Sequence, residues 1–190
     1  MYERWQAKFW EIVKEPKNAN TLKKAAIKER LGEWTEVLTG IVVKTCESMG
    51  WNASAKGHKL NLLPIRRSEY LGLDIMAFSE GDKNWQFPTA VIELENSQNI
   101  NNIAYSLWKV LCVRAMLRMV FCYRRSPEER APLISFLGKE VIKALDVSVR
   151  AELKGNTIVV VGSRDESATF PYGFFKWWRL ENNTGRFRLM

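Results

Sequence analysis

The segment Thr89–Glu95, with the sequence TAVIELE, is the feature that most limits what this chain can fold into. It begins with apolar and β-branched residues, which is typical of a strand buried in a sheet, and then alternates between apolar and acidic residues. Because side chains alternate across a strand, Glu93 and Glu95 face the same side. Ile92 and Leu94 face the opposite side. The sequence therefore predicts a buried strand that ends in two neighbouring carboxylates.

Two carboxylates side by side at the end of a buried strand repel each other. At ~5 Å and an effective dielectric constant of ~20, the repulsion is about 3 kcal/mol. Either protons or a cation must offset this energy. Carboxylate oxygens at such spacing are ligands that suit Mg²⁺ or Mn²⁺. The pattern therefore indicates a metal-binding site at Glu93 and Glu95.

A third acid, Asp74, lies in the middle of another apolar segment, LGLDIMA. Aspartate is depleted in strands and is rarely buried alone. If the two segments are adjacent antiparallel strands, Asp74 approaches Glu93, and Leu73 and Ile75 face the opposite side of the sheet. We therefore predict one site formed by Asp74, Glu93 and Glu95. The alternative is a set of exposed acids on an edge strand, paired to lysine or arginine.

The order of the expected elements predicts the fold class. They are helices over 2–14, 21–49, 100–116 and 127–145, and strands over 51–57, 70–78, 89–95, 117–123 and 156–163. The order predicts an α/β fold in which helices flank a mixed central sheet. We expect one domain over 1–190, with the helix over 1–15 and an aromatic, basic tail over 170–190 as additions. The tail is expected to form a hairpin around 183–185.

Composition and motifs exclude several classes of protein. The 190 residues carry 29 Lys and Arg against 21 Asp and Glu, a net charge of +8, which favours a polyanionic partner such as nucleic acid. His58 is the only histidine, so a catalytic triad or a histidine-rich zinc site has no support. Phosphate-binding glycine loops are absent. No segment is apolar enough to span a membrane, and no signal peptide is visible.

The three cysteines bear on the cellular compartment. Their odd number argues against a disulfide framework. Free, buried thiols fit a reducing cytoplasm, which we take as the expected location.

Asp74 in YLGLDIM, Glu93 and Glu95 in VIELEN, and the helix IAYSLWKVL directly after them resemble the PD-(D/E)xK nuclease superfamily. The resemblance covers about 21–123, where the expected elements match that superfamily's α-β-β-β-α-β core. It implies a restriction-endonuclease-like fold and a Mg²⁺- or Mn²⁺-dependent phosphodiesterase that hydrolyses DNA. In this reading Asp74 and Glu93 hold the metal, which activates the attacking water. The chain departs from the usual pattern at Glu95, where most members carry lysine.

Because Glu95 stands where most members carry lysine, another residue would have to take over the role of that lysine. Some restriction endonucleases of the superfamily are similar in carrying E-x-E, and in other members a lysine from the next helix takes over. Lys109 is that residue here, but its helical position opposite Leu107 and Leu111 favours a solvated face. Glu33 and Glu36 on the preceding helix are weaker candidates for a further acid.

The basic residues fit a path for phosphates. They are Arg66 and Arg67 before the Asp74 segment, Arg124 and Arg125 after the strand over 117–123, and Lys176 and Arg179 in the tail. Aromatic residues among the cations of the tail could stack on bases, or equally pack into the core.

Two other functions stay open. One is a non-catalytic module that binds nucleic acid or serves assembly and keeps the nuclease fold, and the other is an interaction protein with an exposed acid cluster. A homodimer is also left open.

Overall fold

The computed structural model describes residues 1–60, 63–65, 67–81 and 85–190. Its strands form one sheet of seven, in which spatial order follows chain order from β1 to β7. The strands are β1 (Trp51–Ala55), β2 (Ile75–Ser79), β3 (Ala90–Glu95), β4 (Leu117–Arg124), β5 (Asn156–Ser163), β6 (Phe175–Glu181) and β7 (Arg186–Leu189). The three central strands β3, β4 and β5 are parallel, and antiparallel strands flank them on both sides. The predicted mixed α/β sheet is confirmed.

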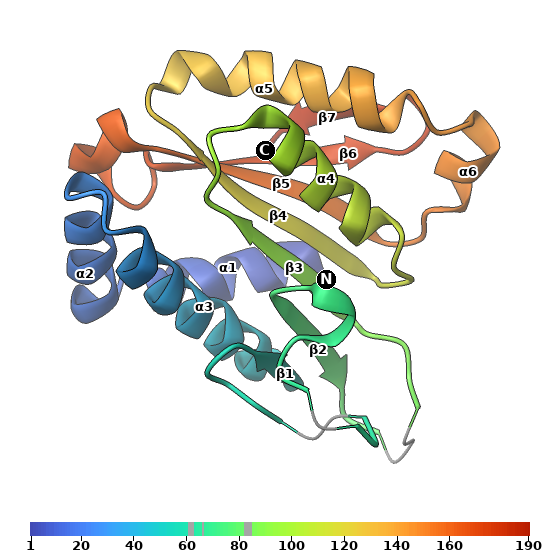
Figure 1. Ribbon diagram of the computed structural model, residues 1–190, viewed down its shortest axis with the longest axis horizontal. Helices are drawn as coiled ribbons and strands as arrows, with labels where there is room; N and C mark the ends of the chain where they lie inside the picture. The colour runs from blue at the N-terminus through green and yellow to red at the C-terminus, as the bar shows by residue number, and fades with distance from the viewer. Residues whose placement is uncertain (61–62, 66, 82–84) are drawn as a thin grey trace.

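Helices cover both faces of the sheet (Figure 1). The helices are α1 (Tyr2–Val13), α2 (Pro16–Ile27), α3 (Leu31–Ser48), α4 (Ile100–Leu111), α5 (Arg130–Leu137) and α6 (Val147–Glu152). One buried cluster joins α1, α2 and α3 to one face, and a second joins α4 and α5 to the other. The connections β3-α4-β4 and β4-α5-α6-β5 lie on the same face, as right-handed crossovers between parallel neighbours require. Among the described residues, the helices are too short or too polar to cross a membrane.

The elements over 31–124 follow the predicted order of one helix, three strands, one helix and one strand. The hairpin of the tail is also confirmed, because β6 and β7 pair antiparallel across the turn at 182–185. Whether this core belongs to the restriction-endonuclease-like group remains a prediction.

The prediction of one helix over 21–49 was wrong. Pro16 begins α2 instead of interrupting the chain, because proline suits the first turn of a helix. The helical path then breaks before α3, where Glu29 adopts a left-handed φ of 53°. The expected helix over 127–145 is likewise divided, since α5 passes into a π-helical turn at Gly138–Ile142. The short helix α6 was not predicted.

The segment around Asp74 also differs from its prediction. Tyr70–Gly72 forms a 3-10 turn with left-handed φ values of 57° at Leu71 and 65° at Gly72, so the strand cannot begin there. It begins at Ile75, and Asp74 is the residue directly before it. Asp74 therefore lies just before the N-terminal end of β2 and not in the middle of a strand. The prediction that Leu73 faces the side of the sheet opposite to Asp74 was also wrong, because Leu73 packs in the buried cluster on the α4 face.

Candidate functional site

The pairing of β2 with β3 places two of the predicted acids together. Ile75 lies opposite Ile92 in this antiparallel register, so one residue further Asp74 comes opposite Glu93. Asp74 Oδ2 accepts a hydrogen bond from the backbone N–H of Leu94 at 2.7 Å. The backbone N–H of Asp74 donates to Glu93 Oε1 at 3.3 Å. The proximity of Asp74 and Glu93 that the sequence predicted is therefore present, and backbone groups fix it.

Helix α4 supplies the rest of the site. Glu93 is 4% exposed, and its Oε2 lies 2.9 Å from Lys109 Nζ. The same ammonium group donates to the carbonyl oxygen of Gly72 at 2.8 Å. The prediction that Lys109 lies on a solvated face was wrong, because its charge is directed over the edge of the apolar face towards β3. We call Asp74, Glu93, Glu95, Ser106 and Lys109 the acid site.

Ser106 was missed by the sequence reasoning. It is 2% exposed, and its hydroxyl lies 3.3 Å from both Glu93 Oε2 and Glu95 Oε2. The single hydroxyl hydrogen serves one carboxylate at a time. Ser106 and Lys109 are three residues apart, so they share one side of α4. A small polar residue within the apolar stripe of the helix was the signal that could have found this side.

Glu95 is held differently from the other two acids. Its Oε1 accepts the backbone N–H of Ser97 at 2.7 Å, and its Oε2 is within reach of Ser106. Both oxygens are thus engaged by neutral donors at the turn that leads into α4. Glu95 faces the same side of the sheet as Glu93, as predicted, but it reaches Glu93 through Ser106.

Burial governs the protonation of the two central acids. Burial raises the pKa of the Asp74 carboxyl above its ordinary value, against the opposing effects of the Leu94 N–H and the Lys109 charge. Burial likewise raises the pKa of Glu93, opposed mainly by the hydrogen bond from Lys109 and reinforced by the charge of Asp74. A cation between the two carboxyls would favour their ionised forms.

The donor set fits a metal held by two carboxylates. Among the described residues, no group of three or more His, Cys, Asp or Glu side chains is arranged to hold a metal ion. Mg²⁺ does not need such a cage, because it commonly takes one or two carboxylates and completes its shell with water and substrate phosphate. Asp74 and Glu93 satisfy that requirement. Glu95 as a third ligand remains a prediction.

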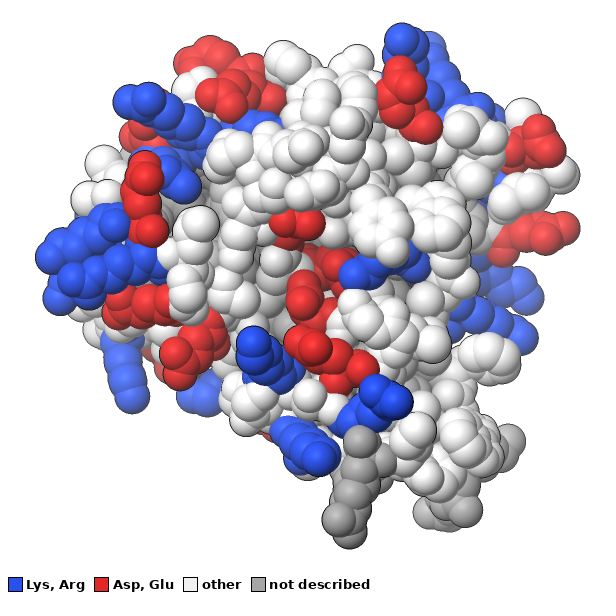
Figure 2. Space-filling model, viewed as in Figure 1, with Lys and Arg blue, Asp and Glu red and all other residues white. Residues whose placement is uncertain are grey.

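One face of the molecule carries acidic and basic side chains close together. Figure 2, which views the molecule as Figure 1 does, shows acidic side chains gathered in a band across the middle of the face, with basic side chains beside them. An anionic substrate that reached these acids would therefore need a cation to reduce the repulsion.

Of the six predicted phosphate contacts, the five that the structure describes do not form one path. Arg124 is 4% exposed and donates to the carbonyl oxygens of Tyr123 and Gln98, so its prediction as a surface contact is corrected. Arg67 and Arg125 are exposed. Arg66 lies outside the described residues.

The two predicted phosphate contacts of the tail face opposite sides of β6. Alternation places Lys176 with Trp178 on one side, and Arg179 with Trp177 on the other. Arg179 donates to the hydroxyl of Tyr2 at 2.9 Å. The aromatic residues of β6 pack into the core: Trp177 is 3% exposed and Trp178 is 8% exposed. Of the two alternatives for the tail, the structure supports core packing.

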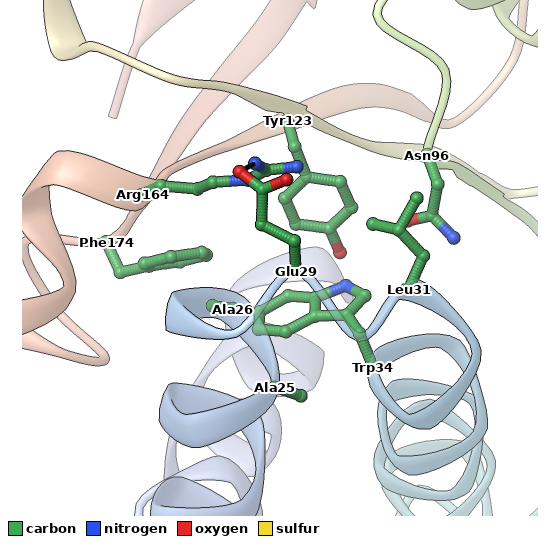
Figure 3. Close-up of a pocket in the computed structure, with 9 residues that line it drawn as sticks. All are labelled: Ala25, Ala26, Glu29, Leu31, Trp34, Asn96, Tyr123, Arg164 and Phe174. Atoms are coloured by element: carbon green, nitrogen blue, oxygen red, sulfur yellow. Dashed lines mark hydrogen bonds and ion pairs between the residues drawn. The ribbon is translucent and has the colours of Figure 1, made fainter.

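A small cavity lies on the opposite side of the same strand ends (Figure 3). It measures about 20 Å³, close to the space that one water molecule needs. Its lining residues are Ala25, Ala26, Glu29, Leu31, Trp34, Asn96, Tyr123, Arg164 and Phe174. An ion pair between Arg164 and Glu29 borders it. We call it the polar cavity.

Within the part of the chain that the structure describes, three buried polar atoms of this lining have no hydrogen-bond partner: Trp34 Nε1, Asn96 Oδ1 and the Tyr123 hydroxyl oxygen. Figure 3 shows the Tyr123 hydroxyl and the Trp34 indole nitrogen directed towards the same space. Burial raises the pKa of Tyr123 well above its ordinary value, so the phenol keeps its proton. No local sequence pattern indicates this cavity, because its residues come from distant segments.

Comparison with known proteins yields no relative. No family model, no curated protein and no solved structure matches this chain.

Proposed function

We propose that the protein is a divalent-metal-dependent nuclease that hydrolyses phosphodiester bonds of DNA. The observation that carries the proposal is Asp74 opposite Glu93 on adjacent strands, with Lys109 bonded to Glu93 from the neighbouring helix. A buried carboxylate and a half-buried one, both with raised pKa values, form with one cationic partner the kind of cluster that marks functional sites.

Each residue of the acid site has a separate part in the proposed reaction. Asp74 and Glu93 would hold Mg²⁺ or Mn²⁺, which supplies Lewis acidity and a water of lowered pKa. Lys109 uses two of its three N–H donors on Glu93 and Gly72 within the described chain. The third N–H is suited to orient a water or to donate to a phosphate oxygen. Lys109 would thus take the part that Glu95 cannot, because a carboxylate has no proton to donate when ionised.

The charge of the chain supports a nucleic acid as substrate. A net charge of +8 attracts polyanions, and Arg67 and Arg125 are exposed. The free cysteines Cys46, Cys112 and Cys122 are consistent with work in a reducing compartment such as the cytoplasm.

The test is cleavage of linear, circular and single-stranded DNA, each with Mn²⁺ and with chelator. Wild type should cleave at least one substrate only with metal, and Asp74→Ala should lose the activity. Asp165→Ala is the matched control, since this exposed aspartate lies far along the chain from the acid site. Cleavage that persists in Asp74→Ala, or that never occurs, would remove the proposal.

A non-catalytic nucleic-acid-binding module is the second candidate function. Glu95 favours it, since it stands where most of the superfamily carries lysine and both of its oxygens are engaged by neutral donors. Such a module need not bind metal. Titration of the protein with Mn²⁺ therefore separates the two functions before any cleavage is measured.

A further inference from the structure

A wide groove lies beside the acid site, between the turn at Tyr70–Gly72, strand β2 and the end of α4. Its volume is about 470 Å³. Large apolar side chains stand exposed along it: Leu71 is 77% exposed, Trp85 is 69% exposed and Phe87 is 67% exposed. A contiguous exposed apolar surface usually marks a place of interaction. We call this surface the aromatic groove.

The charged side chains of the groove are basic. Within the described residues, its lining contains Arg67 and Arg114 and no acidic residue. The guanidinium of Arg114 lies 4.8 Å from the centre of the Phe87 ring, so an aromatic face and a cation are presented together. Phe87 and Arg114 also border a second hollow of about 740 Å³. The groove therefore continues past this pair.

The turn at Tyr70–Gly72 links the groove to the acid site. Leu71 at its edge precedes Gly72, whose carbonyl oxygen accepts the hydrogen bond from Lys109. Lys109 in turn is paired with Glu93. Arg114 follows three residues after the end of α4, the helix that carries Lys109. Among the described residues the lining of the groove holds no member of the acid site, so a strand bound in the groove would reach the carboxylates past the turn at Tyr70–Gly72.

The exposure of these rings contrasts with the burial of three of the other tryptophans. Trp5, Trp34 and Trp177 are each no more than 3% exposed. Rings that stand among cations and are open on one face can stack on unpaired bases, while the cations contact phosphates. A duplex keeps its bases stacked inside and offers no such faces.

We propose that the aromatic groove binds an unpaired stretch of nucleic acid, with bases against Trp85 and Phe87 and phosphates against Arg67 and Arg114. The inference rests on the proposed function, because it assumes that the bound strand continues to the acid site. It narrows the substrate class to nucleic acid with a single-stranded segment.

The test is fluorescence anisotropy with a labelled oligonucleotide at low salt in chelator, where metal-dependent cleavage cannot occur. The probes are single-stranded DNA, single-stranded RNA and the DNA duplex of the same sequence. Wild type should bind a single strand about 10-fold tighter than the duplex, as expected when one or more bases stack. The comparison of DNA with RNA identifies which single strand is preferred.

The double variant Trp85→Leu with Phe87→Leu keeps apolar side chains but removes both ring faces. Its dissociation constant for the single strand should rise about 10-fold or more, with little change for the duplex. Tyr172→Leu is the matched control, because Tyr172 is 56% exposed and packs on Trp10, away from the groove. A second variant, Arg67→Gln with Arg114→Gln, should lower the slope of log affinity against log salt by about 1.4, or ~0.7 for each phosphate contact.

The results separate this inference from the proposed function. Equal affinity for single strand and duplex, or unchanged binding by both double variants, overturns the groove. A wild-type dimer in sedimentation that Trp85→Leu with Phe87→Leu dissociates, without loss of nucleic acid binding, also overturns it and assigns the surface to a second copy. If single strands bind through the two rings but no metal-dependent cleavage occurs, the groove proposal stands and the nuclease proposal is wrong. If cleavage occurs without a preference for single strands, the nuclease proposal stands and the groove proposal is wrong.

Discussion

The ends of β3 and β4 carry two polar regions on opposite faces of the sheet, and these differ in how their polar atoms are used. On the α4 face, the acid site joins Asp74, Glu93 and Lys109 through hydrogen bonds and an ion pair. On the α3 face, Trp34 and Tyr123 beside the polar cavity have polar atoms with no hydrogen-bond partner in the described chain. Two consecutive residues at the end of β3 belong to different regions: Glu95 is part of the acid site, and Asn96 lines the polar cavity.

Burial alone therefore does not mark a reactive site. Both regions bury polar groups, yet only the acid site gathers charges whose ionised forms burial disfavours. Charge held together at a cost to the fold is typical of function. Neutral polar groups left unpaired beside a cavity of about 20 Å³ destabilise the fold less, and one bound water could pair with them. Each prediction below tests one side of this contrast.

The largest effect is expected at Lys109. Lys109→Met should reduce the rate of metal-dependent cleavage by about 10²–10⁴-fold, the usual loss when a positioned proton donor or acceptor is removed. Single-turnover rates in saturating Mn²⁺ are the measurement. Lys139→Met is the control, because the Lys139 side chain is 77% exposed. A Lys109→Met rate equal to that of wild type would show that its ion pair with Glu93 serves only the fold.

A divalent metal should raise the melting temperature of wild type and leave that of a variant with a disrupted acid site unchanged. At metal concentrations ~100 times the dissociation constant the gain is about 2.7 kcal/mol. That corresponds to a rise in melting temperature of about 5–10 °C, at ~2–4 °C per kcal/mol. Asp74→Asn should lose this rise and should melt higher than wild type in chelator, because burial disfavours the ionised Asp74.

The contrary outcomes for metal are equally clear. If wild type melts at one temperature with Mn²⁺, with Mg²⁺ and with chelator, the acid site holds no metal. If Asp74→Asn melts lower than wild type in chelator, the hydrogen bond from Leu94 to Asp74 outweighs the cost of burying the charge.

Local patterns predicted the strands and two of the acids of this site. TAVIELE and the strand over 156–163 were found because alternation and β-branched runs need no information from the rest of the chain. The position of Asp74 was found for the same reason, although the left-handed Leu71 and Gly72 shorten its strand. The break before α3 was missed, because Glu29 is a good helix former and no neighbouring residue type indicates its left-handed backbone conformation.

Tertiary packing accounts for what was missed at the site. Lys109 flanks the apolar stripe of α4, and only the close approach of Gly72 and Glu93 decides which way its charge turns. Arg124 looked like half of a basic pair, but β4 lies in the centre of the sheet and buries it. The polar cavity joins α3, β4 and the turn after β3, a combination that no local pattern contains.

A smaller effect is expected from pH in the absence of metal. The pKa values of Asp74 and Glu93 are raised in the folded protein above ordinary values of 3.8 and 4.5. The folded state therefore binds more protons than the unfolded state in the interval above these values, so stability is lost as pH rises through it. Urea unfolding in chelator should show wild type losing stability relative to Asp74→Asn as pH rises from 4.5. A difference that stays constant, or that grows in favour of wild type, would contradict the assignment of burial as the dominant cause.

The smallest effect is expected on the other side of the contrast, at Tyr123. Its hydroxyl is buried without a partner among the described residues, so Tyr123→Phe should leave the free energy of unfolding unchanged or raise it by up to ~1 kcal/mol. Tyr70→Phe is the matched comparison, because Tyr70 is 4% exposed and its hydroxyl lies 3.3 Å from the carbonyl oxygen of Leu60. That variant should lose about 1 kcal/mol, the usual worth of one hydrogen bond. Urea unfolding measures both, and cleavage by Tyr123→Phe should match wild type. If Tyr123→Phe loses as much stability as Tyr70→Phe, a bound molecule pairs with the Tyr123 hydroxyl in solution, and the two faces of the sheet are more alike than their contacts indicate.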